Sequence, residues 1–338
     1  MRNRRIGLVN RDSYYDKDRA FDNSLSYDYI TYGWVELREM FDMNSCSFET
    51  IESLEQAKRC DILLFNEYPN HIEKLKFLDL SVSKFLLLYE SPLIVPDNYK
   101  VEKHSMFSRV FTWSEDLIKL DPNFYIKINF GLPINRLLIE DNIKERKKGK
   151  VLVAGNKLVR GRGELYSYRQ KLIDHYENSE RTDFDLFGAN WDAYRMSSHN
   201  YFGKGFNRLT RSFKKTPPSN WRGKVNSKMD LYKEYKFSYA IENAHDLPGY
   251  ITEKILHSLL SLTVPLYLGD RTIEKYIPQD LYIDIEGMSF SEIDRYCDDI
   301  STDDLRKMRK SIYSFISEGG LKPFDTKTNA SILCENVL

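Results

Sequence analysis

The fold is decided by residues 235–269, which read Y-K-F-S-Y-A-I-E-N-A-H-D-L-P-G-Y-I-T-E-K-I-L-H-S-L-L-S-L-T-V-P-L-Y-L-G. The apolar runs over 237–241 and 264–268 are typical of buried strands. Between them lies a turn, followed by an apolar helix that begins near residue 252. Strand, helix and strand in this order predict a βαβ unit, the building block of a parallel sheet.

Polar residues stand where such a sheet binds its ligands, beyond the carboxyl ends of the strands. Glu242 and Asn243 directly follow the first strand, and Thr252, Glu253 and Lys254 open the helix. Thr252 suits the N-cap, and the free N–H groups and the positive dipole end of the first turn attract anions. Lys254 adds a positive charge that is unfavourable at a helix N-terminus, so we expect a negative group to compensate it. A phosphate is the favoured group, and Glu253 together with solvent is the alternative.

The rest of the chain repeats the strand-then-helix order on both sides of a charged stretch over 141–150, D-N-I-K-E-R-K-K-G-K. The 338 residues are enough for two domains with cores of their own. We therefore predict an α/β protein of two Rossmann-like domains facing a central cleft. The first domain is expected over residues 1–145. The second is expected over residues 146–338 and includes the C-terminal helices.

The composition is that of a globular protein whose positive and negative charges balance. The formal net charge is zero, which argues against nucleic-acid binding, where a basic domain is expected. The four cysteines are scattered and form no C-x-x-C pair, which fits a reducing compartment. No apolar run is long enough to cross a bilayer, and the basic start leads into a short strand pattern rather than a signal core. We expect a soluble cytoplasmic protein.

No metal or cofactor site is expected from the motifs. The histidines lack paired ligand spacing, and neither G-x-G-x-x-G nor a P-loop occurs. Asp183 and Asp185 form an Asp-x-Asp pair, a pattern with which some sugar transferases bind a divalent ion. Here the two aspartates alternate into the strand D-F-D-L-F-G, so an ordinary strand entry is favoured over a metal site.

Arg169 is a further candidate for anion binding. It borders the buried stripe of a helix, where a guanidinium either extends to solvent or meets a fixed anion. The preceding loop, G-N-K-L-V-R-G-R-G, contains Asn156 and several basic residues among glycines. This composition is typical of a loop that binds phosphate, and it is equally typical of a mobile loop exposed to solvent.

Glu67 and Glu90 are candidates for a general base. Each follows an apolar strand, where a carboxylate is partly desolvated and fit to accept a proton. The local sequence does not distinguish the two. For either one, the alternative is a loop carboxylate that caps backbone N–H groups.

The segment over 204–224 is basic and contains interleaved aromatic residues. It could contact nucleic acid or the anionic face of a membrane. It could equally be a solvated loop near a negatively charged ligand. Its basic residues are Lys204, Arg208, Arg211, Lys214, Lys215, Arg222 and Lys224.

Several motifs together resemble the family 10 fucosyltransferases, the GDP-fucose-dependent α-1,3/1,4 enzymes. The block Y-K-F-S-Y-A-I-E-N, G-Y-I-T-E-K-I, V-P-L-Y-L-G, Y-I-P and Y-I-D-I resembles the family signature. Upstream, E-L-Y-S-Y-R-Q-K-L-I followed by F-D-L-F-G-A-N-W is similar to the arginine helix and next strand of bacterial members, and Y-E-S-P is similar to the acceptor-domain segment. The resemblance covers roughly residues 84–290. It departs from the family at Ser261-Leu262 and Asp270.

The resemblance implies a GT-B fold in which the C-terminal domain binds the donor and the N-terminal domain binds the acceptor. It implies that Glu90 is the general base and that Arg169 and Lys254 hold the donor diphosphate. Glu253 would contact the ribose, and Asn156 stands where members have a Ser-Asn pair. The residues that would line the nucleotide-sugar pocket are Glu242, Asn243, Tyr250 and Thr252.

The expected function is inverting transfer of L-fucose from GDP-fucose to an acceptor glycan, in an α-1,3 or similar linkage and without an obligatory metal. The expected context is lipopolysaccharide, O-antigen or capsule synthesis, with contact to the inner membrane face through residues 204–224 as one role open to that segment. Two alternatives stay open. One is a transferase of the same fold that uses another GDP-deoxyhexose, and the other is a non-catalytic module that binds a GDP-sugar or a glycan.

Overall fold

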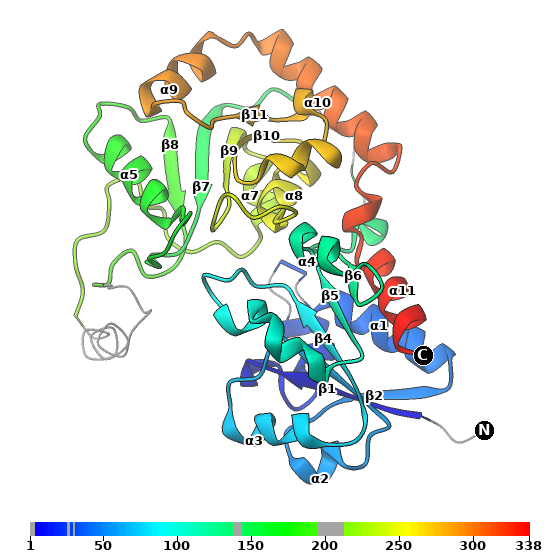
Figure 1. Cartoon of the computed structure of the whole chain (residues 1–338). Helices are drawn as coiled ribbons and strands as arrows, with labels where there is room; N and C mark the ends of the chain where they lie inside the picture. The colour runs from blue at the N-terminus through cyan, green and yellow to red at the C-terminus, as the bar shows by residue number, and fades with distance from the viewer. Residues whose placement is uncertain (1–3, 26–27, 30, 138, 140–143, 195–212) are drawn as a thin grey trace. The chain divides into compact units, whose positions relative to one another are not determined.

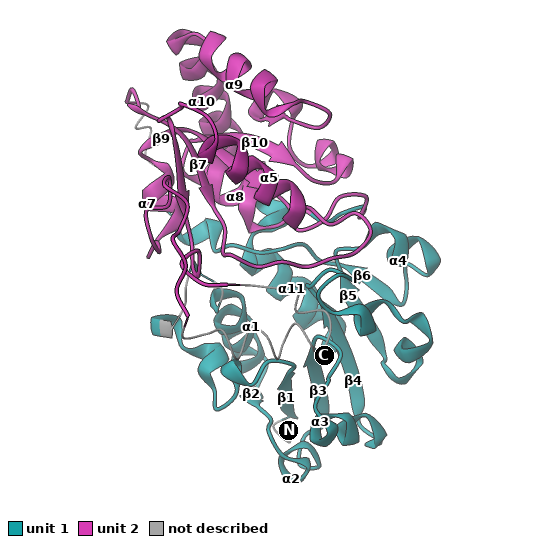
Figure 2. Ribbon diagram, turned by 90° about the vertical axis from the view of Figure 1, so that its left-hand side faces the viewer, with its two compact units in different colours: residues 1–137, 248–250, 322–338 teal, residues 138–247, 251–321 magenta. Residues whose placement is uncertain are grey.

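The computed structural model describes residues 4–25, 28–29, 31–137, 139, 144–194 and 213–338 (Figure 1). The chain divides into two compact units (Figure 2). Unit 1 comprises residues 1–137, 248–250 and 322–338, and unit 2 comprises residues 138–247 and 251–321. No helix among the described residues combines the length and the apolar composition needed to span a bilayer.

Unit 1 is built on a parallel sheet of six strands in the order β2-β1-β3-β4-β5-β6. The order reverses between β1 and β3, the point at which open parallel sheets bind ligands. The strands are β1 (Arg4–Asn10), β2 (Cys46–Thr50), β3 (Ile62–Asn66), β4 (Ser83–Leu88), β5 (Arg109–Thr112) and β6 (Tyr125–Lys127). The helices are α1 (Tyr32–Met43), α2 (Leu54–Ala57), α3 (Ile72–Leu75), α4 (Glu115–Leu120) and α11 (Thr326–Val337).

Alternate residues of the strands in unit 1 enter two separate cores. Leu64 and Leu87 pack in a core with residues of α1 and α11, which lie side by side in Figure 1. Leu63 and Leu86 pack in a second core that contains residues of α2 and α4. Because β3 and β4 are buried on both faces, residues 62–65 and 85–88 are continuous apolar runs without polar alternation.

Unit 2 is built on a parallel sheet of five strands in the order β11-β10-β9-β7-β8. Its order reverses between β7 and β9. The strands are β7 (Lys148–Val153), β8 (Phe184–Phe187), β9 (Tyr235–Ile241), β10 (Val264–Leu268) and β11 (Ile283–Asp284). The helices are α5 (Tyr166–Glu177), α7 (Lys228–Tyr232), α8 (Glu253–Leu260), α9 (Phe290–Asp299) and α10 (Thr302–Ser317).

The structure confirms the α/β class, the parallel sheets and the βαβ unit, which is β9-α8-β10. The expected domain over 146–338 is wrong at its C-terminal end, because residues 322–338 belong to unit 1, as do residues 248–250. The physical reason is the apolar face of α11, where Ala330, Leu333 and Val337 complete the core around α1. An amphipathic pattern shows that a helix packs, but it does not show on which sheet.

Candidate functional site

Glu242 is the centre of a buried polar cluster at the carboxyl end of β9, beside the point where the strand order of unit 2 reverses. It is 0% exposed. It accepts hydrogen bonds from the backbone N–H of Thr252 at 2.8 Å, from the Thr252 hydroxyl at 2.6 Å and from the Lys254 ammonium at 3.2 Å. Burial raises the pKa of Glu242, and the charge of Lys254 opposes that rise. Glu242 therefore fixes the start of α8 to the end of β9.

Lys254 has two negative partners, which are the compensation that its place at a helix start requires. Its Nζ lies 3.2 Å from Glu242 and 3.6 Å from Glu253. Burial lowers the pKa of Lys254, but both carboxylates raise it, and the net shift is upward. Burial likewise opposes ionisation of Glu253, yet Lys254 and Lys228 bring its pKa below the usual range. Glu253 was an expected partner; Glu242 was not, because only the fold brings the two segments together.

Thr252 is the N-cap residue of α8, as predicted, but its side chain does not cap the helix. The hydroxyl donates to Glu242 instead. The N-terminal N–H groups of α8 therefore receive no cap from this hydroxyl, and the backbone N–H of Glu253 interacts with the Glu253 carboxylate.

Arg169 brings a second cation to the same end of β9. It lies on α5, is 8% exposed, and its guanidinium donates to the carbonyl of Ile241 and to Oδ1 of Asn243, each at 3.2 Å. One face of the guanidinium stacks on the ring of Tyr166 at 4.4 Å. The charge of Arg169 also opposes protonation of Lys254, so the two cations are close enough to repel. An anion between two such cations would be strongly favoured.

The carboxyl edge of unit 1 carries the two candidate bases, and the structure separates them. Glu67 follows β3 and is 7% exposed; its Oε1 accepts the backbone N–H groups of Tyr89 and Glu90, each at 2.9 Å. Burial raises the pKa of Glu67 to about 7. Glu90 follows β4 by two residues and is partly exposed. Glu67 thus caps backbone N–H groups, the alternative that the sequence left open for both.

Comparison with known proteins finds a family whose profile matches part of this site. The profile of glycosyltransferase family 10 (fucosyltransferase), C-terminal part, matches residues 199–310, which include β9, α8 and the Glu242–Lys254 cluster. This part of the chain is therefore similar to the fucosyltransferases of family 10. A protein of Acanthamoeba polyphaga mimivirus, named "Putative fucosyltransferase R654", is 47% identical over 49 residues, or 14% of this chain and 8% of that protein. The chain spans about a tenth of the length of the curated relatives it matches.

Solved structures with the same fold cover nearly all of this chain. A crystal structure of an α1,3-fucosyltransferase superposes with a TM-score of 0.55 and 13% identity over 99% of this chain and 91% of that one. An α-glucosyltransferase in complex with UDP superposes with a TM-score of 0.59 and 12% identity over 98% and 99% of the two chains. The fold is GT-B, which consists of two Rossmann-like domains.

Asn156 and Tyr250, two of the expected substrate-binding residues, contact groups outside this cluster. The side-chain amide of Asn156 donates to the carbonyls of Asn190 at 2.9 Å and Ala193 at 3.0 Å, which ties the loop after β7 to the loop after β8. Tyr250 belongs to unit 1, is 1% exposed, and its ring packs on Trp113 with centroids 4.8 Å apart. The cluster at the end of β9 therefore contains Arg169, Glu242, Asn243, Thr252, Glu253 and Lys254.

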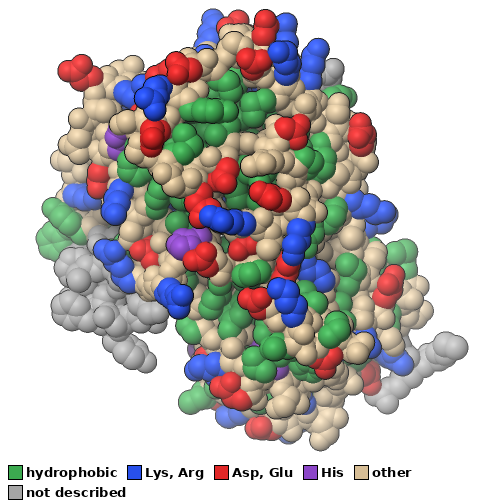
Figure 3. Space-filling model, turned by 45° about the horizontal axis from the view of Figure 1, so that its top comes forward, with side chains coloured by type: hydrophobic (Ala, Val, Ile, Leu, Met, Phe, Trp, Pro, Cys, Tyr) green, Lys and Arg blue, Asp and Glu red, His purple; other side chains and the backbone are tan. Residues whose placement is uncertain are grey.

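The two aspartates of the Asp-x-Asp pair have partners of opposite charge. Asp183 pairs with Lys150 at 2.6 Å and Asp185 with Arg222 at 2.7 Å, so each member of the Asp-x-Asp pair faces a cation. Of the basic segment 204–224, Lys204, Arg208 and Arg211 lie outside the described residues. On the face drawn in Figure 3, acidic and basic side chains of the described residues are interspersed.

Proposed function

We propose that this protein transfers L-fucose from GDP-fucose to a hydroxyl group of an acceptor glycan, with inversion and in an α-1,3 or similar linkage. The proposal depends on one observation above all. The family 10 match over residues 199–310 contains Lys254 and the carboxyl end of β9, and Arg169, which lies outside the match on α5, converges on the same place beside the start of α8. Two close cations and a helix N-terminus form a site for a diphosphate group.

The same groups suit the chemistry of transfer. When the bond between fucose and GDP breaks, negative charge develops on the departing diphosphate. Lys254 and Arg169 are held in place by Glu242 and Asn243, so they can stabilise that charge without reorganising. The two side chains supply the positive charge that a divalent ion supplies in other transferases, and we propose that no metal is obligatory.

We assign Glu90 as the general base that takes the proton of the acceptor hydroxyl. An inverting displacement needs one such group, and a carboxylate beyond the carboxyl end of a parallel strand is well placed for it. The carboxylate of Glu67 already accepts the backbone N–H groups of Tyr89 and Glu90, which leaves Glu90 as the candidate of the two.

The acceptor is proposed to be a lipopolysaccharide, O-antigen or capsule glycan on the cytoplasmic side of the membrane. The four cysteines support a reducing compartment, because all of them are buried free thiols. A panel of such glycans, with GDP-fucose and other GDP-deoxyhexoses as donors, tests both substrates.

The decisive experiment measures GDP release and GDP binding for the wild type, Glu90→Ala and Lys254→Ala. We expect Glu90→Ala to abolish transfer and to keep its affinity for GDP, and Lys254→Ala to weaken GDP binding. A wild type that neither binds nor releases GDP contradicts the proposal. Binding of GDP without turnover on any acceptor would instead indicate a non-catalytic module, and turnover only with another GDP-deoxyhexose would correct the donor.

A further inference from the structure

Glu67 has an unusual backbone conformation beside the proposed base. It directly follows β3, and its N–H donates to the carbonyl of Leu87 at 2.9 Å, which continues the ladder between β3 and β4. Its φ angle is 69°, in the left-handed region that residues with a Cβ atom rarely adopt. Such a conformation persists only where the surroundings fix it, and it is often found where function requires it.

The carboxylate of Glu67 accepts three hydrogen bonds, and two of them hold the segment that carries Glu90. Oε1 accepts the N–H groups of Tyr89 and Glu90, each at 2.9 Å. Oε2 accepts a hydrogen bond from the side-chain amide of Asn98. Since the N–H of Glu90 is itself one of the donors, Glu67 fixes the backbone from which the Glu90 side chain projects.

Asn98 cannot turn away from Glu67, because its other groups are occupied. Its Oδ1 accepts the N–H of Tyr68 at 2.8 Å, so its NH2 group must face Glu67. Its carbonyl accepts from Nε2 of His104 at 2.9 Å. Burial lowers the pKa of His104, so the ring is neutral, and Nδ1 then accepts the hydroxyl of Tyr125 at 2.9 Å. The chain of contacts behind Glu67 is therefore neutral and has a fixed direction.

We propose that Glu67 is a positioning residue for the transfer: its carboxylate holds the Tyr89–Glu90 segment so that Glu90 can take the acceptor proton, and protonation of Glu67 releases that hold. This inference rests on the role proposed above for Glu90. It adds a second carboxylate, which touches neither substrate and acts through the backbone.

Protonation of Glu67 would disrupt these hydrogen bonds, because every partner of its carboxylate is a donor. A proton on Oε2 would face the NH2 group of Asn98, and a proton on Oε1 would face two backbone N–H groups. Burial and the charge of Glu90 raise the pKa of Glu67 to about 7, against the hydrogen bonds that favour the anion. The other titratable groups whose charges interact with it are Arg11, Tyr89 and Tyr99, and burial raises the pKa of both tyrosines, so they stay neutral. Glu67 thus loses its proton as the pH rises through about 7, and we expect kcat to rise over the same interval.

The test is Glu67→Gln, whose amide keeps one acceptor but turns its NH2 group toward Asn98 or toward the backbone donors. We expect kcat to fall at least about tenfold, because small displacements of a reacting group are costly. The KM for GDP-fucose, bound in unit 2, should stay unchanged, and the rise of kcat near pH 7 should disappear. The double variant Glu67→Gln, Asn98→Asp restores a hydrogen-bond network in which every donor faces an acceptor. The carboxylate introduced at position 98 can accept both the N–H of Tyr68 and the amide introduced at position 67, so this variant should recover most of kcat.

Glu36→Gln is the matched control. Glu36 is another carboxylate of unit 1, only 3% of its side chain is exposed, and it pairs with Arg136 rather than with a strand end. This change should lower stability without altering the pH profile of kcat. A Glu67→Gln variant that transfers at the wild-type rate with the wild-type pH profile overturns the inference, and so does a double variant that recovers nothing.

Hydrogen exchange tests the role of Glu67 independently of the proposed transfer reaction, because it requires no turnover. The backbone amides of Tyr89 and Glu90 should exchange faster in Glu67→Gln than in the wild type. In the wild type they should also lose protection as the pH falls below 7, after correction for the pH dependence of the intrinsic exchange rates. If the wild type shows no turnover, the proposed function fails, and this measurement still decides the role of Glu67. Unchanged protection of both amides would refute it.

Discussion

At the scale of single residues, Lys254 has a structural role as well as the proposed binding role. Its ammonium is the cation paired with Glu242, which is 0% exposed. Removing one partner of a buried ion pair leaves the other charge uncompensated and typically costs about 3–5 kcal/mol. We therefore expect Lys254→Met to lower the free energy of unfolding of unit 2 by roughly 3 kcal/mol, measured by urea denaturation at pH 7.

The double variant Glu242→Gln, Lys254→Met separates the two roles. It removes both charges, and the glutamine oxygen can still accept from Thr252, so most of the lost stability should return. GDP binding should stay weak in both variants, because the cation is missing from both. If GDP affinity recovers together with stability, Lys254 acts only through the fold, and the diphosphate contact is wrong.

The structure also shows which site residues local sequence could predict. The residues after β9 and at the start of α8 stand in the sequence where a parallel sheet gathers its ligand groups, and the structure brings them together at the end of β9. Glu67 and Glu90 could not be told apart, since the difference depends on the backbone N–H groups of Tyr89 and Glu90, which lie 22 and 23 residues from Glu67 along the chain. Tyr250 lies next to the predicted pocket residues in the sequence, yet its ring packs on Trp113 within unit 1.

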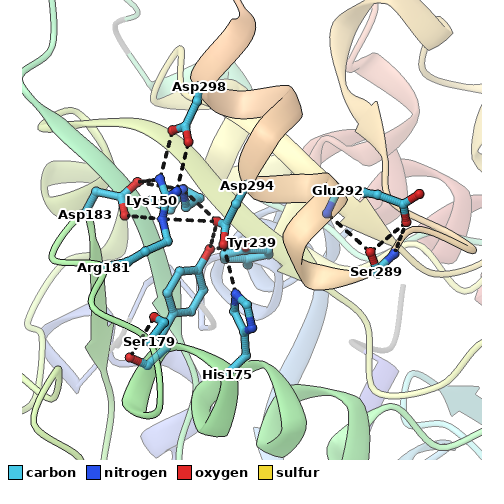
Figure 4. A network of polar contacts seen from close by, with 11 residues as sticks. Lys150, His175, Ser179, Arg181, Asp183, Tyr239, Ser289, Glu292, Asp294 and Asp298 are labelled. Atoms are coloured by element: carbon cyan, nitrogen blue, oxygen red, sulfur yellow. Dashed lines mark hydrogen bonds and ion pairs between the residues drawn. The ribbon is translucent and has the colours of Figure 1, made fainter.

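At the scale of elements, one aspartate attaches α9 to β7 and α5 in unit 2. Figure 4 shows Asp294 of α9 facing Lys150 of β7 and His175 of α5. Its carboxylate lies 3.0 Å from the Lys150 ammonium, 2.9 Å from Nε2 of His175 and 2.6 Å from the hydroxyl of Tyr176. Lys150 is 1% exposed, and its second carboxylate partner is Asp183 at 2.6 Å. The contacts join a helix, a strand and the end of a second helix at one point.

We expect Asp294→Asn to lower the free energy of unfolding of unit 2 by about 2–4 kcal/mol at pH 7, because a buried lysine loses one of its partners. Burial opposes the charge of Asp294, but Tyr176, His175 and Lys150 bring its pKa below the usual range. The unfolded chain therefore binds a proton at a higher pH than the folded one does. The stabilisation by ionised Asp294 is complete at pH values above the ordinary pKa of an aspartate, and it is lost as the pH falls through the lower pKa of Asp294 in the folded chain.

Urea denaturation at pH 7 and at pH 3 checks both effects. The difference between wild type and Asp294→Asn should shrink at the lower pH. Asp298→Asn provides the matched control, because Asp298 is on the same helix and pairs with Arg181 but is half exposed. That change should cost less than about 1 kcal/mol, as exposed pairs do. Equal losses in the two variants would show that burial of the network is not the cause.

At the scale of the whole molecule, the last segment of the chain completes the unit that the first segment begins. The N–H of Leu132 donates to the carbonyl of Phe324 at 2.9 Å, and the N–H of Thr326 donates to the carbonyl of Leu132 at 3.0 Å. Asn329 donates to the carbonyl of Asn129 at 2.7 Å. The helix α11 then buries Ala330, Leu333, Cys334 and Val337. Sequence reasoning assigned this helix to the donor half because it follows that half along the chain, although packing alone decides its place.

Truncation after Leu321 tests this assignment. Burial of a large apolar side chain contributes about 1.5–3 kcal/mol, so loss of α11 removes an amount comparable to the whole stability of a domain, about 5–15 kcal/mol. We expect hydrogen exchange to show unit 1 unprotected, while unit 2 keeps its protection and its proposed binding of GDP. Leu333→Ala should cost about 2–4 kcal/mol in unit 1, and the exposed Lys327→Ala on the same helix less than about 0.5 kcal/mol. If the truncated chain instead lost hydrogen-exchange protection and GDP binding in unit 2 while unit 1 stayed intact, the result would assign residues 322–338 to the second domain.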